Sequence, residues 1–136
     1  MNRLSLITYQ TLIGLSDTLT GGMLIVAPEL TLRLMGLHVA ADSLVYLSFI
    51  GAFVFSVGLA CLYGAVLMVQ RGSPCKMEAV WLLTAITRAS VAVFVVTQIL
   101  AHTLEAGWLT VALTDGACVA IQVIGLRKCW LGNVAR

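Results

Sequence analysis

Three ionisable side chains stand inside long apolar stretches of this 136-residue chain, and they are the residues best placed to do chemistry. Asp17 lies in the first stretch, Arg88 in the third and Asp115 in the fourth. At a helical rise of about 1.5 Å per residue, all three fall roughly 10–20 Å below the outer end of their segments. Each unpaired charge near the middle of a membrane costs about 2.5–3.5 kcal/mol on insertion scales. We therefore expect one shared cluster, in which the guanidinium of Arg88 bridges both carboxylates.

Glutamines extend this expected site. Helical periodicity places each of three glutamines on nearly the same face as the charged residue of its own segment. Polar faces inside a membrane turn toward each other, because lipid cannot satisfy their hydrogen bonds. The predicted ligand-binding residues are therefore Asp17, Arg88, Asp115, Gln10, Gln122 and Gln98.

The charge balance of the cluster leaves three interpretations open. One arginine against two aspartates leaves one negative charge in excess, so one carboxyl is expected to hold a proton and the two to titrate as a coupled pair. Such a cluster could be a buried salt bridge that only fixes helix packing. It could instead recognise the hydroxyl, amine or carbonyl group of a ligand, or serve proton-linked transport.

The composition restricts the class of protein. Hydrophobic residues make up 60% of the chain and charged residues 10%, and the mean hydropathy is +1.02. A soluble domain of this size carries about a quarter charged residues. A soluble enzyme and a disordered tail are therefore excluded, and the net charge of +2 is too small for binding nucleic acid. An integral membrane protein with a single domain over residues 1–136 remains.

Four apolar stretches are long enough to cross a membrane, for which about 20 residues are needed. They are too long and unbroken for the alternating strands of a barrel. The fold class is therefore all-α, a polytopic membrane protein with a four-helix transmembrane bundle. The expected spans are 4–27, 44–69, 79–101 and 108–126. The first is expected to be retained rather than cleaved as a signal peptide, because it contains Gln10 and Asp17.

The segment 28–37 is expected to form a short helix in the outer interface that covers the bundle. Pro28 suits a first helical position and Gly36 a helix end. Glu29 and Arg33 have the i, i+4 spacing of a helical ion pair. The alternative is a continuation of the first span past a proline kink.

The distribution of lysine and arginine predicts the orientation. The first side, with both termini and the middle loop, carries Arg3, Arg71, Lys76, Arg127, Lys128 and Arg136. The other side carries only Arg33. Both termini are therefore expected in the cytoplasm, and the short loops favour a bacterial inner membrane.

Small and aromatic residues add two expectations about packing. Gly51 and Gly58 should let the second span approach a neighbour closely. Trp81, Trp108 and Trp130 lie near the expected interfaces and are predicted to anchor the chain there.

The residue patterns that several kinds of chemistry require are absent from the sequence. The cysteines at 61, 75, 118 and 129 form no CxxC pair, which disfavours a membrane thiol oxidoreductase. Zinc spacing is also missing, and no histidine stands at mid-membrane to ligate a buried haem. His38 and His102, at the outer end near Glu105, are the remaining metal candidates, although isolated loop histidines are more often interfacial residues. No metal and no cofactor is therefore predicted, with a quinone or a lipid as the ligands to consider.

Three segments of the chain resemble the DoxX-like group of small bacterial four-span proteins. They read GGMLIVAPELTLRLMGL, FIGAFVFSVGLACLYG and TAITRASVAVF, the last with an arginine inside the third span. The resemblance implies an accessory subunit of a membrane oxidoreductase assembly, with Arg88 as the matching arginine and no catalytic residue to carry over. The resemblance also implies a fold shared with quinone-linked thiol oxidoreductases, whose redox activity requires cysteines that this chain lacks. Small multidrug exporters match only in their four spans and in an acidic residue like Asp17.

These observations favour an accessory or ligand-binding membrane protein over a stand-alone enzyme. The polar cluster would bind a lipid- or quinone-like molecule or a membrane partner. The expected partners are membrane lipids, another membrane subunit or a second copy of the chain, and no nucleic acid. The alternative is a proton-coupled small transporter, or a membrane enzyme acting on a hydrophobic substrate, in which an intramembrane aspartate titrates.

Overall fold

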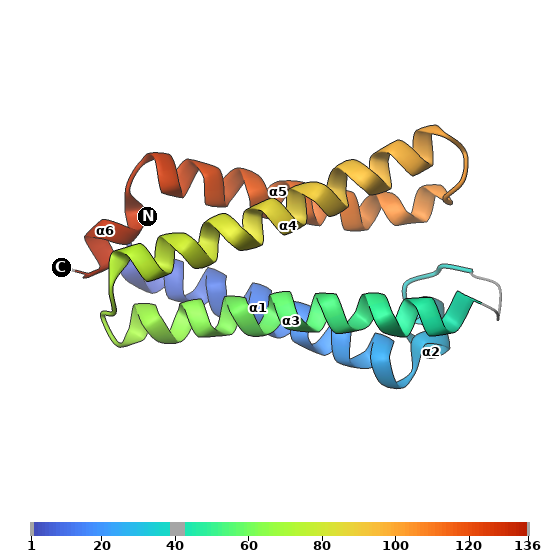
Figure 1. Cartoon of the computed structure of the whole chain (residues 1–136), viewed down its shortest axis with the longest axis horizontal. Helices are drawn as coiled ribbons and strands as arrows, with labels where there is room; N and C mark the ends of the chain where they lie inside the picture. Colours follow the sequence, from blue (N-terminus) through green and yellow to red (C-terminus); the bar gives the residue numbers. More distant parts are fainter. Residues whose placement is uncertain (1, 39–42, 136) are drawn as a thin grey trace. The chain divides into compact units, whose positions relative to one another are not determined.

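The computed structural model describes residues 2–38 and 43–135, and helices account for most of them (Figure 1). No strand occurs in this described part of the chain. The elements are α1 (Arg3–Val26), α2 (Pro28–Leu34), α3 (Leu44–Val69), α4 (Pro74–Leu100), the 3₁₀ turn η2 (Ala106–Trp108), α5 (Leu109–Arg127) and α6 (Trp130–Ala135).

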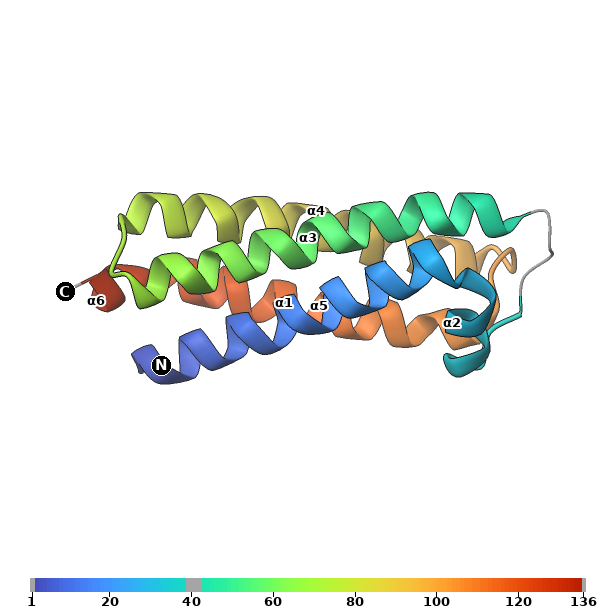
Figure 2. The same cartoon turned by 90° about the horizontal axis from the view of Figure 1, so that it is seen from below.

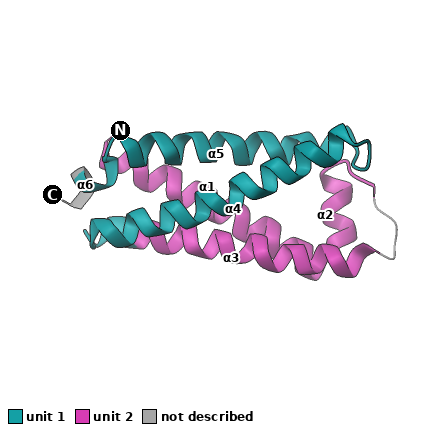
Figure 3. Ribbon diagram, turned by 45° about the horizontal axis from the view of Figure 1, so that its top comes forward, with its two compact units in different colours: residues 1, 67–136 teal, residues 2–66 magenta. Residues whose placement is uncertain are grey.

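The helices form two compact units (Figure 3). The N-terminal unit, Asn2–Val66, contains α1, α2 and most of α3. The C-terminal unit contains Leu67–Arg136, with α4, η2, α5 and α6. Because the chain divides into two compact units, the expected single domain over residues 1–136 stays a prediction.

In the described residues, three helical segments are long and apolar enough to cross a membrane. They are Leu44–Val69, Pro74–Leu100 and Ala106–Arg127. They correspond to the second, third and fourth expected spans, and their length and apolarity are compatible with a membrane protein. Large apolar side chains on all three are exposed, including Phe53, Leu83 and Leu113.

The first expected span, 4–27, forms the 24-residue helix α1, but α1 is not among these three segments. It is long enough to cross a membrane. Its apolarity is lower because Gln10, Asp17 and several threonines and serines interrupt the aliphatic residues. Its role as a fourth span, and with it the four-helix bundle, stays a prediction.

The start of one helix and the presence of another differ from the sequence prediction. The third span was predicted from residue 79, but α4 begins at Pro74, which occupies a first-turn position. Lys76 and Glu78 lower the local hydropathy without disfavouring a helix, so hydropathy alone places the start too late. The tail after residue 126 also contains the short helix α6, which sequence reasoning missed.

The segment after α1 is a separate helix rather than a continuation past a kink. Ala27 has non-helical angles, φ −142° and ψ 65°, and ends α1 before α2 begins at Pro28. Gly36, at φ +71°, ends the helix as expected. The amide of Gly36 donates to the Arg33 carbonyl (3.1 Å) and that of Leu37 to the Leu32 carbonyl (2.9 Å), which is a Schellman cap.

Glycines hold α1 and α3 together in the N-terminal unit. A Cβ added to Gly51 would lie 2.9 Å from the Gly21 carbonyl oxygen, and one added to Gly58 would lie 2.9 Å from the Gly14 carbonyl oxygen. Two glycines seven residues apart on each helix therefore face two on its antiparallel neighbour. The predicted close approach at Gly51 and Gly58 is confirmed, with α1 as the neighbour.

This packing predicts a sharp difference between adjacent glycines of α1. A Cβ at Gly21 would lie 2.7 Å from the Phe55 Cα, whereas one at Gly22 would meet only the Phe55 ring, at 3.9 Å. Gly21→Ala must separate the two backbones and should cost about 1–3 kcal/mol of stability. Gly22→Ala, the matched control, should be neutral or slightly stabilising. Equal thermal unfolding midpoints of the two variants in one detergent would contradict this packing.

Candidate functional site

Buried polar residues of the C-terminal unit lie where α4 and α5 face each other. These two helices run antiparallel, side by side (Figures 1 and 2). Arg88 and Asp115 form an ion pair, in which the arginine Nη1 donates to the aspartate Oδ1 over 2.5 Å. Their side chains are 6% and 14% exposed. The pair lies within two candidate spans, so each charge compensates the other where water cannot.

A second polar contact joins the same helices nearer to the α5 C-terminus. The Gln122 side chain Nε2 donates to the Thr84 hydroxyl over 2.8 Å. That hydroxyl in turn donates to the Val80 carbonyl (2.8 Å). Both side chains are buried. We refer to the Arg88–Asp115 pair together with the Thr84–Gln122 contact as the polar seam.

One side-chain oxygen of the seam is an open hydrogen-bond acceptor. The Oε1 atom of Gln122 is buried and has no hydrogen-bond partner among the residues that the structure describes. The residue as a whole is only 2% exposed. A carbonyl oxygen in this situation accepts a hydrogen bond from any donor that reaches it, and leaving it unsatisfied costs about 1–3 kcal/mol.

Close aromatic packing adjoins the polar seam at its Gln122 end. Trp81 is fully buried, and a Cβ added to Gly125 would lie 3.1 Å from the Trp81 Cη2 and 2.9 Å from a ring carbon of Trp130. The prediction that Trp81 anchors the chain at an interface is therefore wrong, because its side chain is buried. Its position i−3 from Thr84 places it on the helix face that carries the seam, which explains its burial.

The other predicted site residues lie elsewhere. Gln98 accepts a hydrogen bond from the Thr103 hydroxyl (2.5 Å) and thereby fastens the end of α4. It stands ten residues, or about 15 Å along the helix, from Arg88. Gln10 is buried and Asp17 half-buried in α1, which belongs to the N-terminal unit. Their predicted association with Arg88 stays a prediction.

Neither histidine belongs to a metal-binding group among the described residues. His38 follows α2, and His102 follows α4 with a φ of +57°. Across the described ranges, no group of three or more histidine, cysteine or acidic residues is arranged to hold a metal ion.

Sequence reasoning found the Arg88–Asp115 half of the cluster but missed the contact between Thr84 and Gln122. Gln122 was placed on a polar helix face. The missing step was the antiparallel register of α4 and α5, in which a pair at 88 and 115 brings 84 close to 122. That register was not used at the sequence level.

Comparisons of the chain with protein-family models, with curated proteins and with solved structures gave no match. The resemblance to the DoxX-like group therefore stays a prediction.

The ion pair predicts a recovery of stability by a second substitution. Arg88→Ala leaves the Asp115 carboxylate buried without its partner and should cost about 3–5 kcal/mol. Adding Asp115→Asn removes the uncompensated charge, so the double variant should be more stable than Arg88→Ala alone. Ser90→Ala, an exposed change on the same helix, is the control. Denaturant or thermal unfolding in detergent measures the effect, and a double variant that is no more stable would show that the two side chains are not coupled.

Proposed function

We propose that the chain is a multi-pass protein of a bacterial inner membrane with both termini in the cytoplasm. In this proposal α1 is the fourth span of a four-helix bundle. The three apolar segments and the bias of lysine and arginine toward one side support it. The length of α1, 24 residues, is sufficient for a crossing.

We further propose that the protein acts as a ligand-binding accessory protein rather than a stand-alone enzyme, and that the polar seam is its binding site. The observation that carries this proposal is the buried Oε1 atom of Gln122, which lacks a partner in the described chain. Nearly all buried polar atoms in proteins have a hydrogen-bond partner, so an open acceptor beside a paired Arg88–Asp115 favours a missing group.

The chemistry of that position selects the ligand class. A buried amide oxygen needs a donor, so the ligand must present a hydroxyl or an N–H group. The apolar side chains around the spans require that the rest of the molecule be hydrophobic. A lipid with a free hydroxyl, or the reduced form of a quinone, meets both conditions. An oxidised quinone offers only carbonyl oxygens and would not complement Gln122.

Proton-coupled transport receives less support. A transporter of that kind needs an intramembrane carboxyl that loses and regains its proton during each cycle. Asp115 is instead held in an ion pair with Arg88. Such a pair favours a fixed charge distribution that orients a ligand or a neighbouring helix.

Native mass spectrometry of gently extracted protein tests the proposal. The wild type should carry a bound small molecule, and Gln122→Leu should lose it because the acceptor is gone while the side-chain volume is nearly kept. Thr84→Val is the matched control, since it breaks the same contact between α4 and α5 but retains the Gln122 oxygen. Thr84→Val should therefore keep most of the ligand.

Two outcomes would contradict the binding role. Equal occupancy in the wild type and Gln122→Leu would place the ligand elsewhere. If no sample carried a bound small molecule, the polar seam would have only a packing role.

A further inference from the structure

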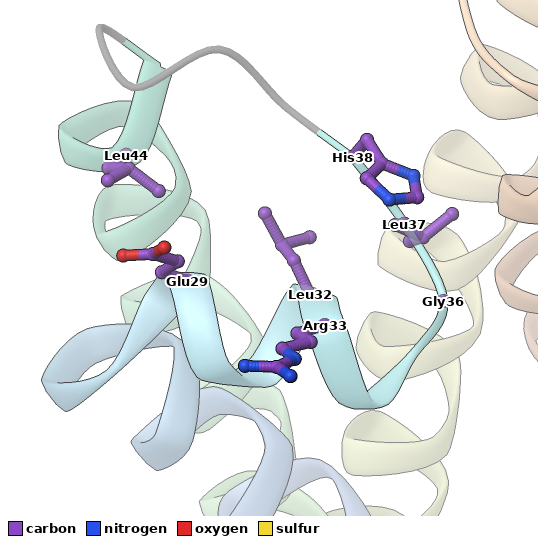
Figure 4. A pocket seen from close by; sticks show the side chains of 7 residues that line it. All are labelled: Glu29, Leu32, Arg33, Gly36, Leu37, His38 and Leu44. Atoms are coloured by element: carbon purple, nitrogen blue, oxygen red, sulfur yellow. The ribbon is translucent and has the colours of Figure 1, made fainter.

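A hollow lies in the N-terminal unit, beside α2 (Figure 4). Its volume is about 360 Å³, within the usual range for small-molecule sites. The apolar part of its lining includes Leu32, Leu37 and Leu44. Leu32 and Leu37 are buried at 3% exposure, because the Schellman cap folds the chain after α2 back onto the helix. The apolar wall of the hollow is therefore shaped by the fold, whereas its charged side chains are exposed.

Its charged groups are Glu29 and Arg33, accompanied by the imidazole of His38. The ion pair predicted between Glu29 and Arg33 from their i, i+4 spacing is not formed, and in the described chain neither side chain takes part in a salt bridge (Figure 4). Both are exposed. Their Cβ atoms on one helix face are about 5–6 Å apart. A single small ligand with a negative and a positive group can therefore reach both.

In the proposed membrane topology, this hollow would lie at the level of lipid headgroups. Leu44, on its wall, is the first residue of the candidate span α3. Leu30 and Leu34 project from α2 with 52% and 69% exposure. A short helix with exposed leucines and charged residues, adjoining the end of a span, is typical of the membrane interface.

We propose that this hollow binds the phosphoethanolamine headgroup of a membrane phospholipid. Arg33 would hold the phosphate through charge-assisted hydrogen bonds, with the His38 ring N–H as a second donor. Glu29 would accept hydrogen bonds from the primary ammonium group. The leucines would contact the glycerol and the first methylenes of the acyl chains.

The charge pattern selects this headgroup over its relatives. A purely anionic headgroup, such as phosphoglycerol, would leave Glu29 without a cation. The quaternary ammonium of choline cannot donate a hydrogen bond, and proteins bind it with aromatic side chains. No tryptophan, tyrosine or phenylalanine is among the described residues that line the hollow.

Calorimetric titration of the full chain in detergent tests the proposal with three soluble probes, the dihexanoyl forms of phosphatidylethanolamine, phosphatidylglycerol and phosphatidylcholine. Phosphatidylethanolamine should bind at least about tenfold more tightly than the other two, the difference made by one hydrogen bond to a charged group. Arg33→Gln should weaken its binding by about tenfold. Glu29→Gln should abolish the preference for phosphatidylethanolamine over phosphatidylglycerol.

Arg127→Gln, which removes an exposed arginine of α5, is the matched control and should bind as the wild type does. Because the two charged residues of the hollow are exposed, their variants should also keep the unfolding midpoint of the wild type. Equal binding of the three lipids, no binding, or the same effect of Arg33→Gln and Arg127→Gln would overturn the proposal. Displacement by millimolar inorganic phosphate would instead indicate a site for free anions and would also overturn it. The headgroup proposal rests on the proposed membrane topology, but this site shares no residue with the polar seam, so its test is independent of ligand binding at the seam.

Discussion

The ion pair between Arg88 and Asp115 is the constraint on which the C-terminal unit depends. Each charge alone inside a span costs about 2.5–3.5 kcal/mol on insertion scales, so neither α4 nor α5 is well suited to the membrane without the other. The 2.5 Å contact fixes which faces of the two helices meet. Once that register is set, Thr84 meets Gln122 and Gly125 meets the Trp81 ring.

The helices of the N-terminal unit are held together in a different way, by the close packing of glycines. Lipid gives apolar helices no hydrophobic reason to associate, so their attraction must come from close packing. Gly14 and Gly21 of α1 face Gly58 and Gly51 of α3, and the backbones approach until no Cβ would fit between them. One unit is thus joined by charge and hydrogen bonds, and the other by shape. This division agrees with the composition of the helices, since α3 carries no charged residue and α4 carries Arg88 at its centre.

The sequence predicts those features whose physical cause is local or costly. The bounds of α3 follow from an uninterrupted apolar run, and Gly36 ends α2 because it adopts a positive φ without strain. Arg88 and Asp115 were found because unpaired charges in a membrane are expensive. Contacts that depend on how the helices align in three dimensions could not be predicted from the sequence. Glu29 and Arg33 have the spacing of an ion pair, yet exposed pairs of this kind gain only about 0–1 kcal/mol, too little to fix either side chain.

The open acceptor of Gln122, its Oε1 atom, follows from the register of α4 and α5. Rotation of the side-chain amide would not give every polar atom of Gln122 a partner. The Thr84 hydroxyl already donates to the Val80 carbonyl and accepts from the Gln122 amide, so it has no proton left for the Gln122 oxygen. Turning the amide over would leave its nitrogen, in place of its oxygen, at the position without a partner. A leucine would fill the same space without an unsatisfied group, and in an apolar span it would be the more stable choice. The presence of glutamine at this depth therefore has a physical rationale if a donor from outside the hairpin completes the seam.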